Sequence, residues 1–202
     1  MHPLRRGRCQ DDGMLKALTA ACAAWCAGLA AQAEPVRYRL DPDHSFVHFE
    51  VLHFGTSTLR GRFGPIEGLV ELDREAGHGA VSLRIATAGV STGLTAFDAR
   101  LREPDLLATE AYPFAEFTAL HFRFDGPRLA AVLGELRLRG LSQALELRAQ
   151  RFGCHRHPQL EREVCGGDFE GELRRGDFGA GFGMPFVDNR VRLRVQVEGI
   201  RQ

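Results

Sequence analysis

Lysine is almost absent from this sequence of 202 residues: Lys16 is its only lysine, and the other cationic side chains are arginines. The formal charge is zero, because 26 basic side chains face 26 acidic ones. Nucleic-acid-binding domains present a basic surface to phosphates, so this balance argues against a nucleic-acid partner. The length is that of one domain with a substantial core.

Catalytic motifs are lacking as well. The chain has no G-x-S-x-G elbow, no H-E-x-x-H pair and no glycine-rich phosphate loop before a helix. Asp98, Arg100, Arg102 and Glu103 gather in one stretch, where such residues are typical of a solvated face; alternatively, Arg100 or Arg174 neutralises an anionic headgroup. We therefore expect no enzyme activity, no catalytic residue, no metal and no resident cofactor.

The sequence also lacks an apolar run long enough to span a membrane. The run at residues 17–31 has about 15 residues, whereas a spanning helix needs roughly 20. It follows a short basic start and ends in Ala-Gln-Ala before Glu34, which is typical of a secretory cleavage site. We interpret residues 1–33 as a signal peptide, for which Met14 is a better initiator than Met1. A buried helix and a lipoprotein site at Cys22 or Cys26 are alternatives that fit less well.

Removal of this leader would leave one exported domain, residues 34–202, with few cysteines. The first 33 residues hold four basic and two acidic side chains, so the domain carries 22 basic against 24 acidic, a net charge of −2. Of five cysteines only Cys154 and Cys165 remain, and an even pair in an exported protein predicts a disulfide. The stretch CHRHPQLEREVC also invites a zinc interpretation, but its spacing matches none of the paired zinc patterns.

Alternation of apolar and polar residues dominates the domain and predicts β-strands. The alternating runs are 36–41, 45–52, 58–63, 66–73, 80–90, 114–126, 129–140, 144–153, 168–179 and 191–200. Residues 95–113 instead have helical spacing with a break at Pro104. We expect an all-β fold, an antiparallel barrel or a sandwich, with one short helical insertion. Periodicity alone leaves open whether the apolar faces fill a core or surround an elongated ligand.

The stretch HSFVHFEVLHFG, residues 44–55, holds three histidines. In a regular strand His44 and His48 share a face but lie about 13 Å apart, too far to share one metal ion, and His53 falls on the opposite face. The pattern favours a strand with histidines at its ends over a metal site. An alternative is an enzyme that acts on a lipid or quinone, using His44 or His53 as acid–base with Asp98.

Five blocks of the sequence resemble, in the same order, the blocks of the YceI family. They are YRLDPDHSFVHFEVLHFG (38–55), GRFGPIEGLVELD (61–73), TGLTAFDARLREPDLLATEAYPFAEF (92–117), GELRLRGLSQALEL (134–147) and RRGDFGAGFGMPFVDNRVRLRVQVE (174–198). The resemblance implies an extended, lipocalin-like antiparallel β-barrel in the periplasm, whose apolar interior holds a polyisoprenoid.

Single positions also match recurring residues of that family. They are His44, Ser45, His53, Asp98, Leu101, Arg102, Pro113, Phe117, Gly140 and Asp177. Two features depart from the family pattern. Arg175-Gly176 stands where the family usually has Arg-Ser, and the insertion between Cys154 and Cys165 occurs in only part of the family.

The resemblance leads to a candidate site for an amphiphilic isoprenoid or isoprenoid-quinone-like lipid. We expect an apolar lining that includes Phe46, Val51, Leu83, Phe114, Phe117, Phe122, Leu136 and Phe182. For the polar mouth, the candidates are His53, Asp98 and Arg102. A ligand-free structural barrel with a solid phenylalanine core is a further alternative, and the sequence leaves a homodimer open.

Overall fold

The computed structural model describes residues 34–202, so the expected signal peptide lies outside the described residues. This part of the chain forms ten strands, one α-helix and two 3₁₀ helices. Their bounds are β1 Val36–Leu40, β2 Phe46–His53, β3 Ser57–Phe63, β4 Ile66–Asp73, β5 His78–Ala86, η1 Thr87–Gly89, α1 Thr95–Leu101, β6 Phe114–Asp125, β7 Arg128–Leu138, β8 Leu141–Arg156, β9 Glu163–Arg174, η2 Arg175–Phe178 and β10 Val187–Arg201. Within residues 34–202, no helix has the length and apolar character needed to cross a membrane.

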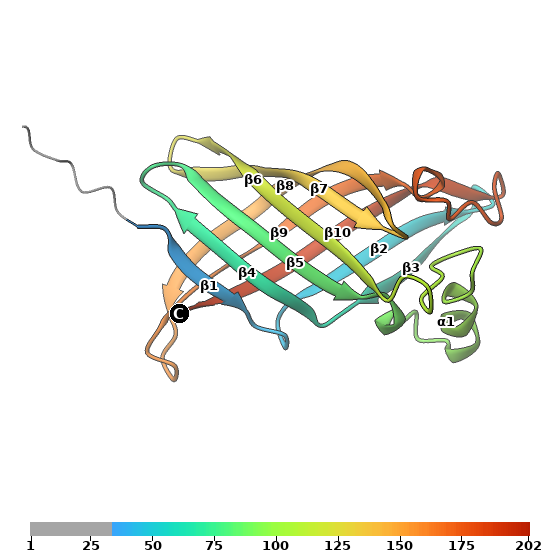
Figure 1. Ribbon diagram of the computed structural model, residues 1–202, viewed down its shortest axis with the longest axis horizontal. Helices are drawn as coiled ribbons and strands as arrows, with labels where there is room; N and C mark the ends of the chain where they lie inside the picture. Colours follow the sequence, from blue (N-terminus) through green and yellow to red (C-terminus); the bar gives the residue numbers. More distant parts are fainter. Residues whose placement is uncertain (1–33) are drawn as a thin grey trace, which may run out of the picture. The chain divides into compact units, whose positions relative to one another are not determined.

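The strands form one antiparallel sheet that closes into a barrel (Figure 1). Its order is β1-β4-β5-β6-β7-β8-β9-β10, and β1 closes the ring through three residue pairs with the end of β10. The earlier part of β10, Val187–Gln196, pairs instead with β2, which pairs with β3. The predicted extended antiparallel barrel with one short helix is therefore confirmed.

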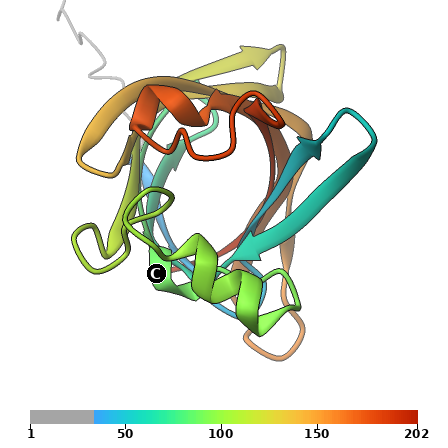
Figure 2. The ribbon, with the colours of Figure 1, turned by 90° about the vertical axis from the view of Figure 1, so that its right-hand side faces the viewer.

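The two ends of the barrel differ in what they carry. The β2–β3 turn, α1 and the loop after η2 lie at one end, which Figure 2 views along the barrel. At the other end Cys154 and Cys165 lie opposite each other in β8 and β9 and form the predicted disulfide. We call these the α1 end and the disulfide end.

Register shifts change which residues of the long strands face inward. In β6 the register against β7 shifts between Ala119 and His121. Before the shift the odd-numbered Phe117 points inward, and after it the even-numbered Phe122 does so, while Leu120 is 72% exposed on the outer wall. A shift of one residue moves every later side chain to the other face, so strict alternation fails along such a strand.

Polar contacts tie the helical insertion to the barrel. The helix ends before Pro104, as the sequence predicts. The Asp98 carboxylate accepts hydrogen bonds from the backbone N–H and the hydroxyl of Thr92, at 2.6 and 2.7 Å. The Arg102 guanidinium donates to the carbonyl oxygens of Ala88 and Val90, at 3.0 and 3.3 Å. These contacts place α1 across the end of the barrel.

Candidate binding site in the barrel interior

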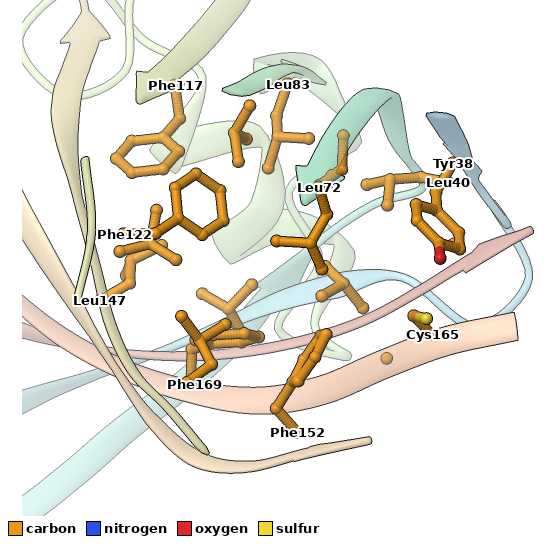
Figure 3. Close-up of a pocket in the computed structure, with 18 residues that line it drawn as sticks. Tyr38, Leu40, Leu72, Leu83, Phe117, Phe122, Leu147, Phe152, Cys165 and Phe169 are labelled. Carbon is orange, nitrogen blue, oxygen red and sulfur yellow. The ribbon is translucent and has the colours of Figure 1, made fainter. Parts of the chain in front are cut away.

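Two cavities lie in line inside the barrel. The larger, about 180 Å³, extends toward the α1 end, and the smaller, about 80 Å³, toward the disulfide end. Leu83, Phe117, Leu147 and Val195 line both cavities, so these four side chains form a neck between the two. Figure 3 shows the side chains around the smaller cavity. Phe117, Leu83 and Leu147 of the neck lie on one side of it, and Phe152 and Tyr38 lie on other sides. The interior therefore offers two apolar spaces in line, with the side chains of the neck between them.

The larger cavity is almost wholly apolar in its lining. Of its 24 lining residues only Thr87 and Arg175 are polar. The Thr87 hydroxyl donates to the carbonyl oxygen of Tyr112 at 2.8 Å. The polar atoms of Arg175 likewise bond backbone oxygens. A ligand in this cavity would consequently be held by apolar contacts rather than by hydrogen bonds.

Arg175 is a buried cation with an unusual set of partners. Its guanidinium donates to the carbonyl oxygens of Asp188, Ala180, Phe182 and Val187, at 2.8, 2.6, 2.8 and 2.8 Å. Burial lowers the pKa of this guanidinium, but arginine remains charged at neutral pH. The four bonds fix the loop between η2 and β10, which borders the larger cavity through Ala180.

The smaller cavity ends at Tyr38, and the hydroxyl of this tyrosine bonds a carboxylate. The Tyr38 side chain is buried, and its hydroxyl donates to Glu163 at 2.5 Å. Arg74 binds the second carboxylate oxygen of Glu163 at 3.2 Å. Burial, together with the Glu163 carboxylate, raises the pKa of Tyr38 to about 12. The hydroxyl therefore stays neutral, and the ring closes the cavity as an apolar wall.

Five of the eight predicted lining residues face the cavities. They are Val51, Leu83, Phe117, Phe122 and Leu136. Each lies at an inward position of its strand, and the bulge in β6 allows both Phe117 and Phe122 to do so. These positions make them wall residues; whether they bind a ligand stays a prediction.

The other three predicted lining residues lie outside both cavities. Phe46 precedes the inward Val47 and packs under the Arg62 guanidinium, 4.7 Å from its ring centroid. Phe114 has the opposite parity to Phe117 and lies under Arg84 at 3.3 Å. Phe182 is in the loop after η2, under Arg100 at 4.2 Å. In each case an arginine covers one face of an outward ring, a favourable cation–π arrangement.

The predicted polar mouth is not assembled as expected. His53, Asp98 and Arg102 belong to the α1 end, but none of the three lines either cavity. Asp98 is engaged by Thr92, and these hydrogen bonds lower the pKa of its carboxyl. Arg102 holds two backbone carbonyls. These hydrogen bonds of Asp98 and Arg102 anchor the helical insertion.

The residues of the enzyme alternative lie apart. The His44 ring bonds the Asp41 carboxylate, with 2.8 Å between Nδ1 and Oδ2, and this hydrogen bond raises the pKa of His44. His44 precedes β2 and His53 ends it, so the length of the strand separates them. Asp98 bonds Thr92 rather than either histidine. The structure does not bring these three side chains together as an acid–base pair.

Sequence reasoning missed several interior residues, and only some of them left a signal. Phe49 shares the parity of Val51 and lines the larger cavity, so consistent use of alternation in β2 would have found it. Phe169 lines the smaller cavity from β9. Arg175 could not have been found this way, because its partners depend on how the loop of residues 180–188 folds.

Comparison with known proteins places this geometry among related barrels. The sequence model described as a YceI-like domain matches residues 38–199. The protein YceI of Escherichia coli is 32% identical over 191 residues, covering 93% of this chain and 97% of that protein.

Solved structures show the same fold at lower sequence identity. The crystal structure of BcnA from Burkholderia cenocepacia superposes with a TM-score of 0.64 at 17% identity, covering 79% of this chain and 98% of that one. A polyisoprenoid binding domain from Saccharophagus degradans, implicated in plant cell wall breakdown, gives a TM-score of 0.60 at 18% identity and covers 83% and 99% of the two chains.

Proposed function

Because the chain belongs to the YceI family, we propose that it is a carrier that holds a long-chain isoprenoid lipid, a polyisoprenoid or an isoprenoid quinone, inside its barrel. The observation that carries this proposal is the pair of apolar cavities that lie in line on either side of the neck. The structural likeness to a polyisoprenoid binding domain supports it.

The size of the cavities supports a bound molecule rather than a solid core. Protein interiors have few voids larger than a water molecule. A cavity costs about 24 cal/mol per Å³ of volume that the side chains fail to fill. Left unfilled, spaces of about 180 and 80 Å³ would lower the free energy of unfolding by on the order of 6 kcal/mol. That is a large part of the stability of an ordinary domain, so a ligand that fills both spaces would offset a substantial cost.

The shape and chemistry of the space suit an isoprenoid tail. A polar ligand would lose its hydrogen bonds to water on entering the cavity. The two polar side chains of the larger cavity, Thr87 and Arg175, already bond backbone oxygens. An isoprenoid tail is elongated and fully apolar, and its burial contributes roughly 25 cal/mol per Å² before the cost of ordering it. Its headgroup would remain outside the apolar space, toward the α1 end, where the larger cavity lies.

Export to the periplasm is part of the same proposal. The leader expected at residues 1–33 and the Cys154–Cys165 disulfide both fit an oxidising compartment. The carrier would there bind its lipid outside the reach of cytoplasmic reductants. One mass measurement tests both points, since cleavage after Ala33 and loss of two hydrogens each change the mass of the chain.

The test is native mass spectrometry of protein purified from its own periplasm without detergent, followed by lipid extraction. We expect an adduct whose fragments are isoprenoid. Leu83→Trp places a large ring in the neck, whereas Ser82→Trp places the same ring on the outer wall of the same strand. The adduct should disappear from the first variant and persist in the second. Bare protein in all three samples, with no isoprenoid in the extract, would contradict the proposal.

A further inference from the structure

Large apolar side chains are exposed mainly at the α1 end. Phe54, Phe182, Met184 and Phe186 are 59%, 55%, 41% and 61% exposed. Phe54 lies in the β2–β3 turn, and the other three lie in the loop between η2 and β10. We call these four residues the apolar tip. Isolated exposed hydrophobic residues are ordinary, but a contiguous group at one end of a molecule marks an interaction site.

The two loops of the apolar tip contact each other directly. The Phe54 and Phe186 rings stack, with centroids 5.3 Å apart, and the Phe54 N–H donates to the Phe186 carbonyl oxygen at 2.7 Å. Residues 179–187 contain no charged side chain, and residues 51–59 contain none apart from the ionisable His53. The tip therefore consists of two joined loops without charged side chains of their own, and the Arg100 guanidinium of α1 lies over its Phe182 ring, 4.2 Å from the ring centroid.

The apolar tip is held in place from behind. Four carbonyl oxygens between Ala180 and Asp188 accept hydrogen bonds from the buried Arg175 guanidinium. A loop fixed in this way cannot fold its apolar side chains back into the barrel without breaking those bonds. The chain thus stabilises a conformation that leaves three large apolar side chains in water.

Two exposed arginines lie next to the base of the apolar tip, and one of them, Arg190, pairs with Glu172 at 3.2 Å between Nε and Oε1. On the outer wall of β9 and β10, Arg174 lies opposite Arg190 in the row next to the loop, and both side chains are exposed. Residues 46–63 and 170–194 together hold seven arginines and five acidic residues, a net charge of +2. The rest of residues 34–202 holds 15 arginines and 19 acidic residues, a net charge of −4. This excess lies on β2, β3, β9 and β10 with their tip loops and includes the buried Arg175, whereas the α1 insertion beside them, residues 92–112, holds two arginines and four acidic residues.

We propose that the α1 end docks on the surface of an anionic phospholipid bilayer, with the apolar tip inserted among the acyl chains and Arg174 and Arg190 at the level of the phosphates. Apolar side chains flanked by arginine are the combination that binds to the interface of anionic membranes. Docking needs no cargo. Its use for passing an isoprenoid between bilayer and barrel rests on the proposed function, since the larger cavity extends toward this same end.

The absence of tryptophan from residues 34–202 allows a specific test, because Trp25 is the only tryptophan of the sequence. Phe186→Trp would place a single fluorophore in the apolar tip, and Leu120→Trp would place one at an exposed site on the outer wall. With vesicles of equal parts phosphatidylcholine and phosphatidylglycerol, the Phe186→Trp emission should shift to the blue and be quenched by brominated acyl chains. The Leu120→Trp emission should not change.

Flotation with the same vesicles measures the affinity. Phe182→Ser combined with Phe186→Ser should lower the partition coefficient by about tenfold or more, whereas Leu120→Ser should leave it unchanged. Arg174→Gln should lower it by about fivefold on the mixed vesicles and by little on phosphatidylcholine alone. Arg128→Gln, which changes the exposed arginine at the start of β7, is its matched control.

Two results would overturn docking on a bilayer. The wild type could remain in the supernatant with both kinds of vesicle, or the tip variant could float as the wild type does. If the tip variant instead converted a dimer to a monomer without changing flotation, the surface would contact a second copy of the chain. Native mass spectra of the tip variant keep the two proposals apart, because a retained isoprenoid adduct leaves the carrier proposal intact.

Discussion

The two ends of the barrel are stabilised in different ways. At the disulfide end a covalent bond joins β8 to β9, and an Arg74–Glu163–Tyr38 network closes the smaller cavity. At the α1 end one buried guanidinium holds a charge-free loop through backbone carbonyls. The first arrangement closes the barrel with side chains that face one another. The second fixes a loop so that its apolar side chains face outward, which suits an end where molecules enter and leave.

The largest expected effect comes from removing the guanidinium at the α1 end. Arg175→Ala would leave four carbonyl oxygens with lost partners, and we expect a loss of about 4 kcal/mol in the free energy of unfolding in urea. Amides of residues 180–188 should exchange hydrogen faster. Arg174→Ala, the exposed neighbour, should change stability by less than about 0.5 kcal/mol. If the two substitutions lowered stability equally, the claim that the Arg175 guanidinium fixes the loop of residues 180–188 would be contradicted.

Breaking the disulfide is the matching test at the other end. Cys154→Ser combined with Cys165→Ser opens a loop closed across 11 positions, and the chain-entropy model gives a loss of about 3 kcal/mol. The wild type should lose this amount of stability in urea when a reductant is added, and the double variant should not respond to reductant. Faster hydrogen exchange should appear near β8 and β9 and leave the loop of residues 180–188 unchanged.

A smaller effect is expected from the tyrosine that ends the smaller cavity. Tyr38→Phe keeps the ring and removes one hydrogen bond to a carboxylate, so we expect a loss of about 1 kcal/mol. The pKa of Tyr38 is raised to about 12, which means that the folded state favours the neutral phenol. Its contribution is present below the ordinary pKa of 10.0 and is lost as the pH rises toward 12. Tyr38→Phe should lack that alkaline loss, as urea unfolding between these pH values would show.

The smallest effect concerns the exposed pair Asp41 and His44. Their hydrogen bond raises the pKa of His44 from 6.5 and lowers that of Asp41 from 3.8. The contribution of His44 to the free energy of unfolding is present below the ordinary pKa of histidine. It is lost as the pH rises through the raised pKa. The contribution of Asp41 to the free energy of unfolding is present above the ordinary pKa of aspartate. It is lost as the pH falls through the lowered pKa. Both are present between about pH 4 and pH 6.5.

An NMR titration of the imidazole protons checks this pair. The His44 resonance should titrate at a higher pH in the wild type than in Asp41→Asn. Because the pair is exposed, Asp41→Asn should change stability little at any pH. An unchanged His44 titration in that variant would show that the carboxylate does not act on the ring in solution.

The fold was accessible from the sequence because alternation, turns and the Pro104 break are local signals. The disulfide followed from the count of cysteines left after the leader. The lining was only partly accessible, because period-2 alternation identifies two faces but not which is inner, and the bulge after Ala119 exchanges them within β6. Phe46 was predicted together with Val51, which has the opposite parity in β2, and Phe114 together with Phe117, which has the opposite parity in the same part of β6. Arg175 was beyond reach, since its partners are carbonyl oxygens that any sequence supplies.

The closure of the barrel has a mechanical consequence. β1 and β10 meet through three residue pairs, with Tyr38 opposite Arg201, and one further backbone hydrogen bond flanks these pairs on each side, from Gln202 to Arg37 and from Asp41 to Glu198. A force applied between the two termini would therefore pull adjacent strand ends apart, along the direction of the hydrogen bonds rather than along the strands. The bonds would break one pair at a time. Stretched from its termini, this barrel should open at the β1–β10 seam under a small load, before the longer β9–β10 pairing is strained.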